Sequence, residues 1–600
     1  MIILKKQTDT SIFTMHNRKR LNIILGAFAF LLVIMVARLL YVMVIKSEQY
    51  SSAAQEVQER ERKIKASRGI IYDRNGVVIA GNKPVCSISV IHNQIKDPER
   101  VINILSDKLQ IDEATIRKKV EKKSSREKIK SNVDKALADE IRNLNLDGVM
   151  VDEDHKRYYP YSQLASKVIG FTGGDNQGIV GLEVKYDEVL MGEDGSINTL
   201  TDARGIEVAN AAETRVDPIP GNNLVISLDV NIQQYLEQQA IEVMKKKNAK
   251  RVCIVMMNPQ NGEIYGLADV PEYNLNEPFT LNYEVEAGEK VTQDMLNRMW
   301  RCFCINDTYE PGSTFKIITA TAAFEENVVN VTDGFYCPGY RVVEDRRIRC
   351  SSTVGHGQQT FREGIMNSCN PVFIDIGARV GTKNFYKWLQ NLGLFETTGV
   401  DLPGEANSIF HKIDNVGPVE LATMSFGQSF QITPLQLLRA VSAVINGGTL
   451  VTPHFGMYIT DANNNIIQTL EYEVEKNVIS SETSETMKSL LEAVVAEGTG
   501  KKAYIEGFRI GGKTATSEKL PRRSGKYISS FLGFAPADNP QVITLIMIDE
   551  PEGVYYGGTI AAPVVGEIYE NVLPYLGIKR DETVKDEEDT EVFYFQDGVF

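Results

Sequence analysis

The chain has 600 residues, of which 43% are hydrophobic and 24% are charged, and its formal net charge is −14. This length exceeds what a single hydrophobic core usually organises, so two or three domains are expected. The composition excludes a largely disordered chain, and the excess of negative charge argues against nucleic acid as a partner.

A basic segment and a long apolar run open the chain. Residues 1–20 are rich in lysine and arginine, whereas residues 21–45 are almost wholly apolar and long enough for a helix to cross a bilayer. The run is long for a cleaved signal peptide, and no small-residue cleavage site follows it, so we expect an uncleaved transmembrane anchor at 21–46. The basic residues before it predict a cytoplasmic N-terminus and an extracytoplasmic remainder. Arg38, the one charge in the span, either reaches the outer interface or faces a partner helix.

The next part of the chain mixes the patterns of helices and strands. Residues 47–65 are polar and charged, without proline or glycine, and predict a helical stalk. Farther along, 85–91 is typical of a strand and 112–123 of a helix. The basic cluster at 117–130 is interpreted as the solvated face of a helix, with contact to an anionic wall polymer as the alternative. No nucleophile with a neighbouring base is found before about residue 224.

From residue 225 onward, strands at both ends of the segment enclose a mostly helical middle. The predicted strands are 224–229, 253–257, 263–268, 530–534 and 542–548. A helix begins at about residue 232, and Asn261–Gly262 is a dipeptide typical of hairpin turns. Early and late strands with helices between them indicate an α+β domain. Residues 579–600 are acidic and predict a disordered tail.

One stretch in the helical middle pairs a nucleophile with a base. Residues 309–316 read Tyr-Glu-Pro-Gly-Ser-Thr-Phe-Lys, and an apolar run that predicts a helix follows. Residues three apart share a helix face, so the Lys316 amine lies beside the Ser313 hydroxyl. A partly desolvated amine can take the proton of a serine, and the positive end of the helix stabilises the negative charge that develops. Taken alone, Ser-x-x-Lys is more often the solvated start of a helix.

Two further motifs follow this one. They are Ser368-Cys369-Asn370 and residues 511–516, Gly-Gly-Lys-Thr-Ala-Thr. The order Ser-x-x-Lys, Ser-x-Asn, Lys-Thr-Gly is the signature of penicillin-binding proteins and serine β-lactamases. Other stretches that resemble class B penicillin-binding proteins are 67–76, 181–183, 202–205, 498–501, 529–536 and 555–558. Over about residues 20–575 the chain resembles this family of monofunctional peptidoglycan D,D-transpeptidases.

The resemblance implies an α+β architecture in three parts: an N-terminal transmembrane helix, an elongated mixed α/β pedestal, and a penicillin-binding transpeptidase domain. The last is expected to contain an antiparallel five-stranded sheet flanked by helices. The expected segments are 1–20, a cytoplasmic basic segment; 21–46, the transmembrane anchor; 47–224, a non-catalytic pedestal of the dimerisation type; 225–578, the transpeptidase domain; and 579–600, an acidic tail.

The resemblance also implies catalytic roles. Ser313 matches the nucleophile that attacks the D-Ala-D-Ala end of a stem peptide, and Lys316 matches its base. Ser368 matches the residue that relays a proton to the leaving amine. Asn370 matches the residue that orients Lys316 and a peptide amide. The acyl group then passes to an amine of a neighbouring strand.

A third set of matching residues lies on the strand expected to border the cleft. Lys513 matches the cationic residue of that strand, and Thr514 and Thr516 are expected to bind the terminal carboxylate. The oxyanion hole is expected to use the backbone N–H groups of Ser313 and Thr516. This chain departs from the family at Ala515, where the pattern has glycine. Because glycine allows another chain to approach closely, the added methyl is expected to narrow the cleft or to shift the strand.

The cysteines suggest a metal site. Cys337, Cys350 and His356 have the spacing Cys-x12-Cys-x5-His, and zinc accepts such mixed ligands in tetrahedral sites. We therefore predict a structural zinc with Cys304 as the fourth ligand and Cys369 as the alternative. An extracytoplasmic domain also permits a Cys337–Cys350 disulfide, and free thiols are the third possibility. Two other cysteines are interpreted as plain buried residues: Cys86 and Cys253.

The predicted function is that of a membrane-anchored serine D,D-transpeptidase that cross-links peptidoglycan stem peptides and is acylated by β-lactams. The chemistry requires no cofactor. No second catalytic domain is found, so glycan polymerisation is expected from a partner, and the resemblance implies a SEDS-type glycosyltransferase and other cell-wall machinery in the membrane. One alternative is a D,D-carboxypeptidase with water as acceptor. The other is a non-catalytic β-lactam sensor or scaffold in which Ala515 impairs turnover.

Overall fold

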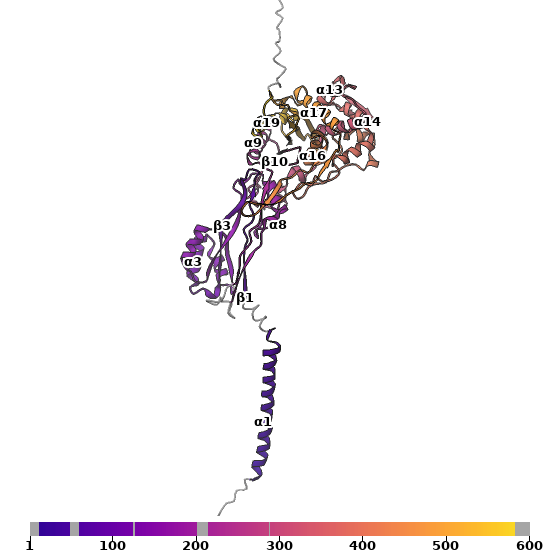
Figure 1. Ribbon diagram of the computed structural model, residues 1–600. Coiled ribbons are helices and arrows are strands. Elements are labelled where there is room, and N and C mark those ends of the chain that lie inside the picture. Colours follow the sequence, from indigo (N-terminus) through magenta and orange to yellow (C-terminus); the bar gives the residue numbers. More distant parts are fainter. Residues whose placement is uncertain (1–10, 49–58, 124–125, 201–213, 287–288, 582–600) are drawn as a thin grey trace, which may run out of the picture. The chain divides into compact units, whose positions relative to one another are not determined.

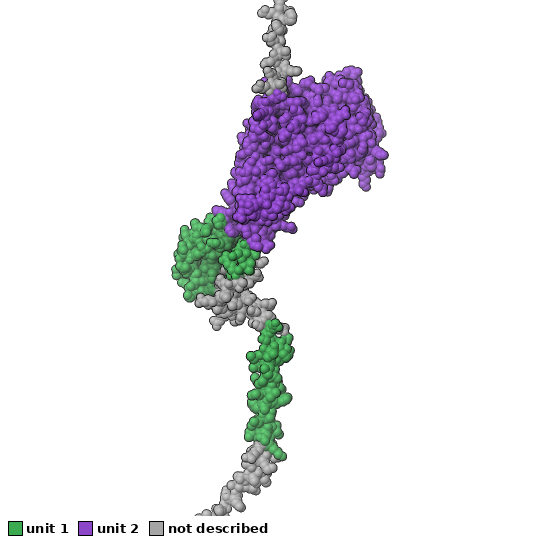
Figure 2. Space-filling view, viewed as in Figure 1, with its two compact units in different colours: residues 1–65, 84–154, 194–218 green, residues 66–83, 155–193, 219–600 purple. Residues whose placement is uncertain are grey.

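The structure is a computed structural model, and it describes residues 11–48, 59–123, 126–200, 214–286 and 289–581 (Figure 1). These residues form two compact units (Figure 2). The first contains residues 1–65, 84–154 and 194–218, and the second contains residues 66–83, 155–193 and 219–600. Part of the predicted stalk, the family stretch 202–205 and most of the acidic tail lie outside the described residues.

The first helix is the predicted membrane span. α1 (Ser11–Leu40) continues into the π-helical turn η1 (Tyr41–Ile45). Within it, Lys19–Ile45 is long and apolar enough to cross a membrane, as judged by length and composition. The prediction of an apolar helix at this end is confirmed, and the helix is consistent with a single-pass anchor.

Strands replace the end of the predicted stalk. β1 (Glu59–Ile64) pairs antiparallel with β6 (Gly195–Leu200), and β6 pairs with β7 (Thr214–Val216). The helical prediction is therefore wrong for residues 59–64. A polar segment without glycine or proline permits a helix, but here a partner strand far along the chain supplies the backbone hydrogen bonds.

The rest of the first unit is a small helix-on-sheet layer. Its elements are the second half of β3 (Val78–Val90), η2 (His92–Gln94), α3 (Pro98–Leu109), α4 (Glu113–Val120), β4 (Glu127–Asp134), α5 (Lys135–Asn143) and most of β5 (Val149–Tyr158). Apolar side chains of β3 and of the three helices form its core. α4 confirms the helix predicted at 112–123. The cation Arg117 on this helix pairs with Glu99 and Glu113 on the surface, in agreement with a solvated face.

Family stretches that are far apart in the sequence meet at one buried ion-pair network of the second unit. Arg68 Nε lies 2.6 Å from Glu183 Oε2, and Arg157 Nε lies 2.6 Å from Glu183 Oε1. All three side chains are almost fully buried, so removing one would leave an uncompensated charge in the interior. The nearby elements are β2 (Ile71–Tyr72), α6 (Ser166–Ile169), α7 (Gly181–Lys185), α8 (Asp187–Leu190), β8 (Asn223–Ile226), β16 (Gly456–Thr460) and β17 (Ile466–Thr469).

A five-stranded antiparallel sheet forms the centre of the second unit, in the order β10–β9–β21–β20–β19. The strands are β9 (Arg251–Met257), β10 (Ile264–Val270), β19 (Gly511–Glu518), β20 (Tyr527–Ala535) and β21 (Val542–Asp549). Alternate residues of β9 enter two different cores, because successive side chains of a strand point to opposite faces. Both faces are covered, which explains the continuous apolar run that predicted the strand. The predicted five-stranded sheet and the β9–β10 hairpin are confirmed.

Helices cover both faces of this sheet. α9 (Val230–Lys247) and α19 (Ala562–Tyr575) lie side by side on one face (Figure 1). The other face packs against a helical region with these elements: α10 (Gln293–Trp300), α11 (Phe303–Asn306), η3 (Gly312–Phe315), α12 (Lys316–Glu325), α13 (Phe361–Met366), α14 (Asn370–Asn391), η4 (Ile413–Asn415), α15 (Pro418–Met424), α16 (Pro434–Ile445) and α17 (Ser481–Ala496). The remaining helices are η5 (Lys501–Ala503) and α18 (Gly557–Ile560).

Three small strand pairs belong to the same unit. β11 (Gly334–Cys337) pairs with β14 (Gly357–Thr360), β12 (Tyr340–Val343) with β13 (Arg346–Arg349), and β15 (Thr449–Val451) with β18 (Val474–Lys476). The first two pairs lie between α12 and α14 in the sequence. They therefore connect the two helices that carry the predicted catalytic residues.

Candidate active site

The turn before α12 exposes a single hydroxyl. Ser313 is half-buried, whereas every residue of α12 from Lys316 to Ala323 is buried. Gly312 has φ +58°, and a Cβ added to it would lie 2.3 Å from Ser517 Oγ on β19. Glycine is therefore required there, both for the left-handed conformation and for the close approach of the strand. The predicted nucleophile occupies the accessible point of a rigid turn.

Lys316 is fully buried and is held by the second motif. Its Nζ donates to Ser368 O at 2.7 Å and to Asn370 Oδ1 at 2.7 Å, and lies 3.3 Å from Ser368 Oγ. Burial lowers the pKa of this amine to about 8, against the opposing effect of nearby cysteine thiolates. Near neutral pH a useful fraction of the amine is uncharged and can accept a proton. The structure thus brings Lys316, Ser368 and Asn370 together, with Ser313 in the turn directly before Lys316.

The second motif is shaped by the junction of two helices. Thr360 and Glu363 form a capping box at the start of α13, and that helix ends just before Ser368. Ser368 has φ +52°, an uncommon value for a residue with a side chain. α14 begins at Asn370 with Pro371 in its first turn. This local strain directs both the carbonyl of Ser368 and the amide of Asn370 toward Lys316.

We expect the rate of acylation by penicillin to rise with pH. In the predicted role of Lys316 the neutral amine is the active form, and its pKa of about 8 lies below the usual value of a lysine. The rate should therefore increase more than tenfold between about pH 6 and 8 and level off above about pH 9. Stopped-flow acylation across this range checks the prediction, with the melting temperature measured at each pH as the control. A rate independent of pH would contradict the role of the amine.

β19 is the third component of the site, and its side chains alternate between two faces. Lys513, Ala515 and Ser517 lie on the face toward Gly312 and α12, as the closeness of Ala515 and Ser517 to Gly312 shows. Thr514 and Thr516 lie on the opposite face. Within the five-stranded sheet, β20 is the one strand paired with β19, so β19 forms an edge.

Lys513 is a second buried lysine. Its exposed fraction is 0%, and Thr514 O lies 3.5 Å from its Nζ. Burial, together with the charge of Lys316, holds the pKa of Lys513 well below its usual range. No carboxylate pairs with either amine in the part of the chain that the structure describes. A bound carboxylate would therefore favour the protonated form of Lys513 and pair with it.

The hydroxyls of the two threonines already have partners. Thr514 Oγ1 donates to Thr499 Oγ1 at 3.1 Å, and Thr516 Oγ1 accepts from the Gly557 N–H at 3.0 Å. Thr499 and Gly557 belong to stretches that carry the family resemblance, but no local pattern links them to these threonines. The second contact leaves the hydroxyl proton of Thr516 free to be donated to a ligand.

The methyl group of Ala515 does not line open space. Its residue is 3% exposed, and its Cβ lies 3.7 Å from the position that a Cβ on Gly312 would occupy. The methyl thus lies beneath the strand, against the turn of the nucleophile. The expectation that it narrows the cleft is not supported by this geometry.

Replacement of Ala515 by glycine should lower stability more than reactivity. The change removes a buried methyl and increases the freedom of the unfolded strand, so we expect a loss of about 1–2 kcal/mol in unfolding free energy. Acylation rates with several β-lactams should change less than about threefold. Denaturant unfolding and acylation kinetics measure the two quantities. A change in acylation that depends on the β-lactam would show that the methyl meets the ligand.

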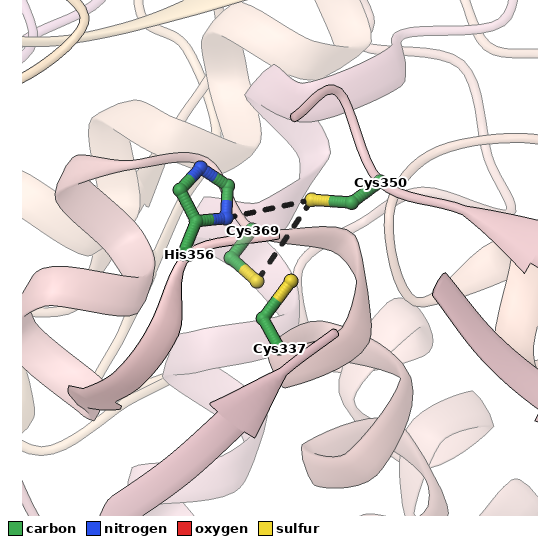
Figure 3. Close-up of side chains that lie close together, drawn as sticks. All are labelled: Cys337, Cys350, His356 and Cys369. Atoms are coloured by element: carbon green, nitrogen blue, oxygen red, sulfur yellow. Dashed lines mark hydrogen bonds between the residues drawn. The ribbon is translucent and has the colours of Figure 1, made fainter. Parts of the chain in front are cut away.

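Four possible metal ligands lie together, and one of them stands between Ser368 and Asn370 in the sequence (Figure 3). They are Cys337, Cys350, His356 and Cys369, and their ligand atoms all lie within 4.8 Å of one another. Cys350 Sγ lies 4.0 Å from Cys369 Sγ and 3.6 Å from His356 Nδ1. Ligands about 2.3 Å from a tetrahedral zinc are roughly 3.8 Å apart, so the donor set and its spacing fit zinc.

The chemistry around the sulfur atoms also fits a metal. The three thiols are buried, and the hydrogen bond between Cys350 and Cys369 lowers the pKa of Cys350. Gln359 Nε2 donates to Cys369 Sγ at 3.1 Å, a contact of the kind that orients metal ligands. The structure leaves Cys337 and Cys350 unbonded to each other.

The fourth predicted ligand is corrected by the structure. Cys304 forms a disulfide with Cys253, and Cys369 takes the place in the cluster. The reason is the position of α11, which packs Cys304 against β9, away from the strands that carry the other ligands. The interpretation of Cys253 as a plain buried residue is wrong for the same reason. Cys86 is buried and free, as expected.

Comparison with known proteins agrees with these observations. The family described as "Penicillin binding protein transpeptidase domain" matches residues 252–570, and the "Penicillin-binding Protein dimerisation domain" matches residues 63–226. The chain belongs to the penicillin-binding protein transpeptidase family. This penicillin-binding protein is therefore of class B, with both characteristic domains, and the predicted family and fold are confirmed. The family comprises peptidoglycan D,D-transpeptidases of the serine type, so the predicted enzyme class is confirmed as well.

Curated relatives and solved structures resemble this penicillin-binding protein over nearly its whole length. It is 39% identical to stage V sporulation protein D of Bacillus subtilis, over 94% of this chain and 86% of the relative. It is 29% identical to the probable peptidoglycan D,D-transpeptidase PenA of Neisseria gonorrhoeae, over 94% of each. The crystal structure of penicillin-binding protein 2X from Streptococcus thermophilus is similar with a TM-score of 0.71 and 22% identity, over 86% of this chain and 81% of that one. At this identity the structural likeness shows the fold alone.

Proposed function

We propose that this penicillin-binding protein cross-links stem peptides through an acyl-enzyme on Ser313. The observation that carries the proposal is the buried amine of Lys316, which hydrogen bonds to both Ser368 and Asn370 one helical turn from the accessible Ser313 hydroxyl. A buried lysine without a carboxylate partner is costly, so its retention at this place favours a chemical role.

The proposed reaction uses these groups in turn. Neutral Lys316 takes the proton of Ser313, and Oγ attacks the carbonyl carbon of the penultimate D-Ala. The oxyanion is stabilised by the N–H groups of Ser313 and Thr516. The C–N bond then breaks, and Ser368 relays a proton to the departing D-Ala. An amine of a second peptide attacks the ester in the reverse sense and releases Ser313.

The carboxylate of the donor peptide is assigned to β19. On the edge strand of the sheet, Lys513 supplies the positive charge and Thr516 supplies a hydroxyl donor. Thr514, whose hydroxyl donates to Thr499 in the structure, would have to turn its proton toward the peptide. The support is the deep burial of Lys513 without a carboxylate partner, and the free hydroxyl proton of Thr516. A carboxylate at this position would be bound by charge-assisted hydrogen bonds, which are stronger than neutral ones.

One experiment tests the whole proposal. The full chain in detergent is incubated with a D,D-peptide donor and an amine acceptor, and the products are separated by mass spectrometry; a parallel sample receives penicillin. We expect release of D-Ala together with the cross-linked product, and one penicillin adduct per chain. Release of D-Ala without cross-linked product would support a carboxypeptidase. An adduct without turnover would support a sensor.

We also infer that the cysteine cluster of Cys337, Cys350, His356 and Cys369 holds a structural zinc ion. Bound zinc would supply a covalent-like cross-link among the two small strand pairs and α14, without taking part in acyl transfer. Cys369 lies between Ser368 and Asn370 in the sequence, so the cluster would fix the backbone that positions both. Neighbouring residues thus have separate proposed roles: Ser368 and Asn370 take part in acyl transfer, and Cys369 binds the metal.

The orientation and surroundings of the protein complete the proposal. The basic residues before the apolar helix support a cytoplasmic N-terminus, with the pedestal (47–224) and the transpeptidase domain (225–578) outside. The disulfide between Cys253 and Cys304 agrees with an oxidising compartment. Glycan polymerisation is assigned to a SEDS-type glycosyltransferase that contacts the anchor and the pedestal.

The cellular role is proposed from one relative. Identity of 39% to stage V sporulation protein D over 94% of the chain, compared with 26–29% to the FtsI and PenA proteins, supports a role in sporulation. Deletion of the gene should then reduce the number of heat-resistant spores without changing vegetative growth. A growth defect in the absence of sporulation would contradict this assignment.

A further inference from the structure

The β12–β13 hairpin presents two different faces. Its register pairs Tyr340 with Arg349, Arg341 with Ile348, Val342 with Arg347 and Val343 with Arg346. Cross-strand pairs share a face, and successive pairs alternate between faces. We call one face the inner face: Arg341, Val343, Arg346 and Ile348. We call the other the outer face: Tyr340, Val342, Arg347 and Arg349.

The inner face is used for packing. Val343 and Ile348 lie against the hydrophobic core of the second unit, and Arg341 forms an ion pair of 2.8 Å with Asp375 on α14. These contacts fix the hairpin on the first turns of α14. The outer face consequently points away from that helix and toward solvent.

The outer face combines exposed apolar surface with two available cations. Val342 is 57% exposed, and the guanidinium of Arg347 lies over the ring of Tyr340, 3.7 Å from its centroid. Arg349 is exposed, and neither Arg347 nor Arg349 forms an ion pair with any described residue. The stacking orders the guanidinium of Arg347 while leaving its N–H groups free.

This face begins at the wall of the active site. Arg349 O accepts a hydrogen bond of 3.0 Å from Asn370 Nδ2. The other amide atom of that asparagine, Oδ1, accepts a hydrogen bond from Lys316. The next residue, Cys350, points toward Cys369 within the cysteine cluster (Figure 3). The outer face is thus joined to Asn370, whereas β19 lies against Gly312 in the turn of Ser313.

We propose that the outer face binds a carboxylate of the acceptor stem peptide; this rests on the transpeptidase function proposed above. The donor peptide ends at β19, whose free edge can accept an extended chain by strand addition. The acceptor needs a separate surface that places its amine near the acyl-enzyme. Guanidinium groups recognise carboxylates bidentately, and stem peptides are anionic, so Arg347 and Arg349 provide charge complementarity on the side that the donor leaves free.

The test compares two acceptors with the same amine and different charge. Full-length protein in detergent is acylated by a thioester D-Ala donor, and then receives either Nα-acetyl-D-lysine or its C-terminal amide. Mass spectrometry gives the ratio of amine transfer to hydrolysis for each. One exposed ion pair corresponds to a preference of about fivefold for the free carboxylate at low salt, and this preference should shrink at high ionic strength.

Matched variants assign the preference to the face. In the double variant Arg347→Gln/Arg349→Gln the two acceptors should become equivalent within about twofold. The control Arg346→Gln removes a guanidinium from the inner face of the same strand and should retain the preference. Three results would overturn the proposal. They are the absence of a preference for the free carboxylate in the unsubstituted protein, retention of the preference in the double variant, and its loss to the same extent in the Arg346→Gln control. If the proposed transpeptidase function itself is wrong, no acyl-enzyme will form in the first step of the assay, before any acceptor is added.

Discussion

Replacement of Ser313 by alanine is expected to abolish covalent labelling by fluorescent penicillin. The hydroxyl of Ser313 is the accessible one in its turn, one helical turn before Lys316, whereas the other hydroxyl near that amine, Ser368 Oγ at 3.3 Å, is buried. Loss of a nucleophile of this kind reduces turnover by about 10⁴–10⁶-fold. At such a rate no labelled protein is detectable after minutes of incubation. Gel fluorescence and intact-mass measurement of the variant give the result.

The control for this variant separates chemistry from folding. Ser524 is an exposed serine in the loop between β19 and β20, and Ser524→Ala should label as fast as the unsubstituted protein. Both variants should melt within about 2 °C of the parent, because neither removes a buried apolar group. Labelling that persists in Ser313→Ala would place the nucleophile elsewhere.

Loss of the zinc site should lower stability and acylation together. Replacement of Cys350 by serine removes one of four ligands from a buried cluster, so zinc would be retained weakly or not at all. We expect the melting temperature to fall by about 5 °C or more, and acylation to slow about tenfold because the backbone of Ser368 and Asn370 loses its support. Chelation of the unsubstituted protein should reproduce both effects. Elemental analysis, thermal melting and penicillin acylation are the measurements.

A second buried thiol serves as the control for the metal. Cys302 is free and 2% exposed but lies outside the cluster, so Cys302→Ser should keep about one zinc per chain. Protein purified without chelators that holds no metal, and in which Cys337 and Cys350 are joined by a disulfide, would replace the zinc proposal with a bridge. A metal-bound Cys350→Ser variant of normal stability would show that Cys350 is not a ligand.

Sequence was most informative where the determining physics is local. The three-residue spacing of Ser313 and Lys316 places both side chains on one helical face, and the structure has the turn and the helix at these positions. The Asn261–Gly262 turn likewise determines a hairpin by itself. The resemblance to penicillin-binding proteins added the pairing of distant motifs, which periodicity alone does not provide.

Sequence was misleading where contacts between distant segments decide. Residues 59–64 contain no glycine or proline that would disfavour a helix, but in the structure they form a strand that pairs with Gly195–Leu200. Cys304 precedes Ser313 by nine residues and therefore looked like a ligand near the site. Its helix instead packs on β9, and Cys369 reaches the cluster from the junction of α13 and α14. Proximity along the chain was a poor guide to proximity in space.

The buried methyl of Ala515 has a consequence for how such enzymes are recognised. A sequence pattern that requires glycine after Lys-Thr assumes that any side chain at the third motif position would clash with the neighbouring backbone. Here the strand leaves room for one carbon atom beneath it, next to Gly312. If Ala515→Gly leaves acylation unchanged, genome surveys that reject alanine at this position would discard transpeptidases, and inhibitor design could treat both variants as the same target surface.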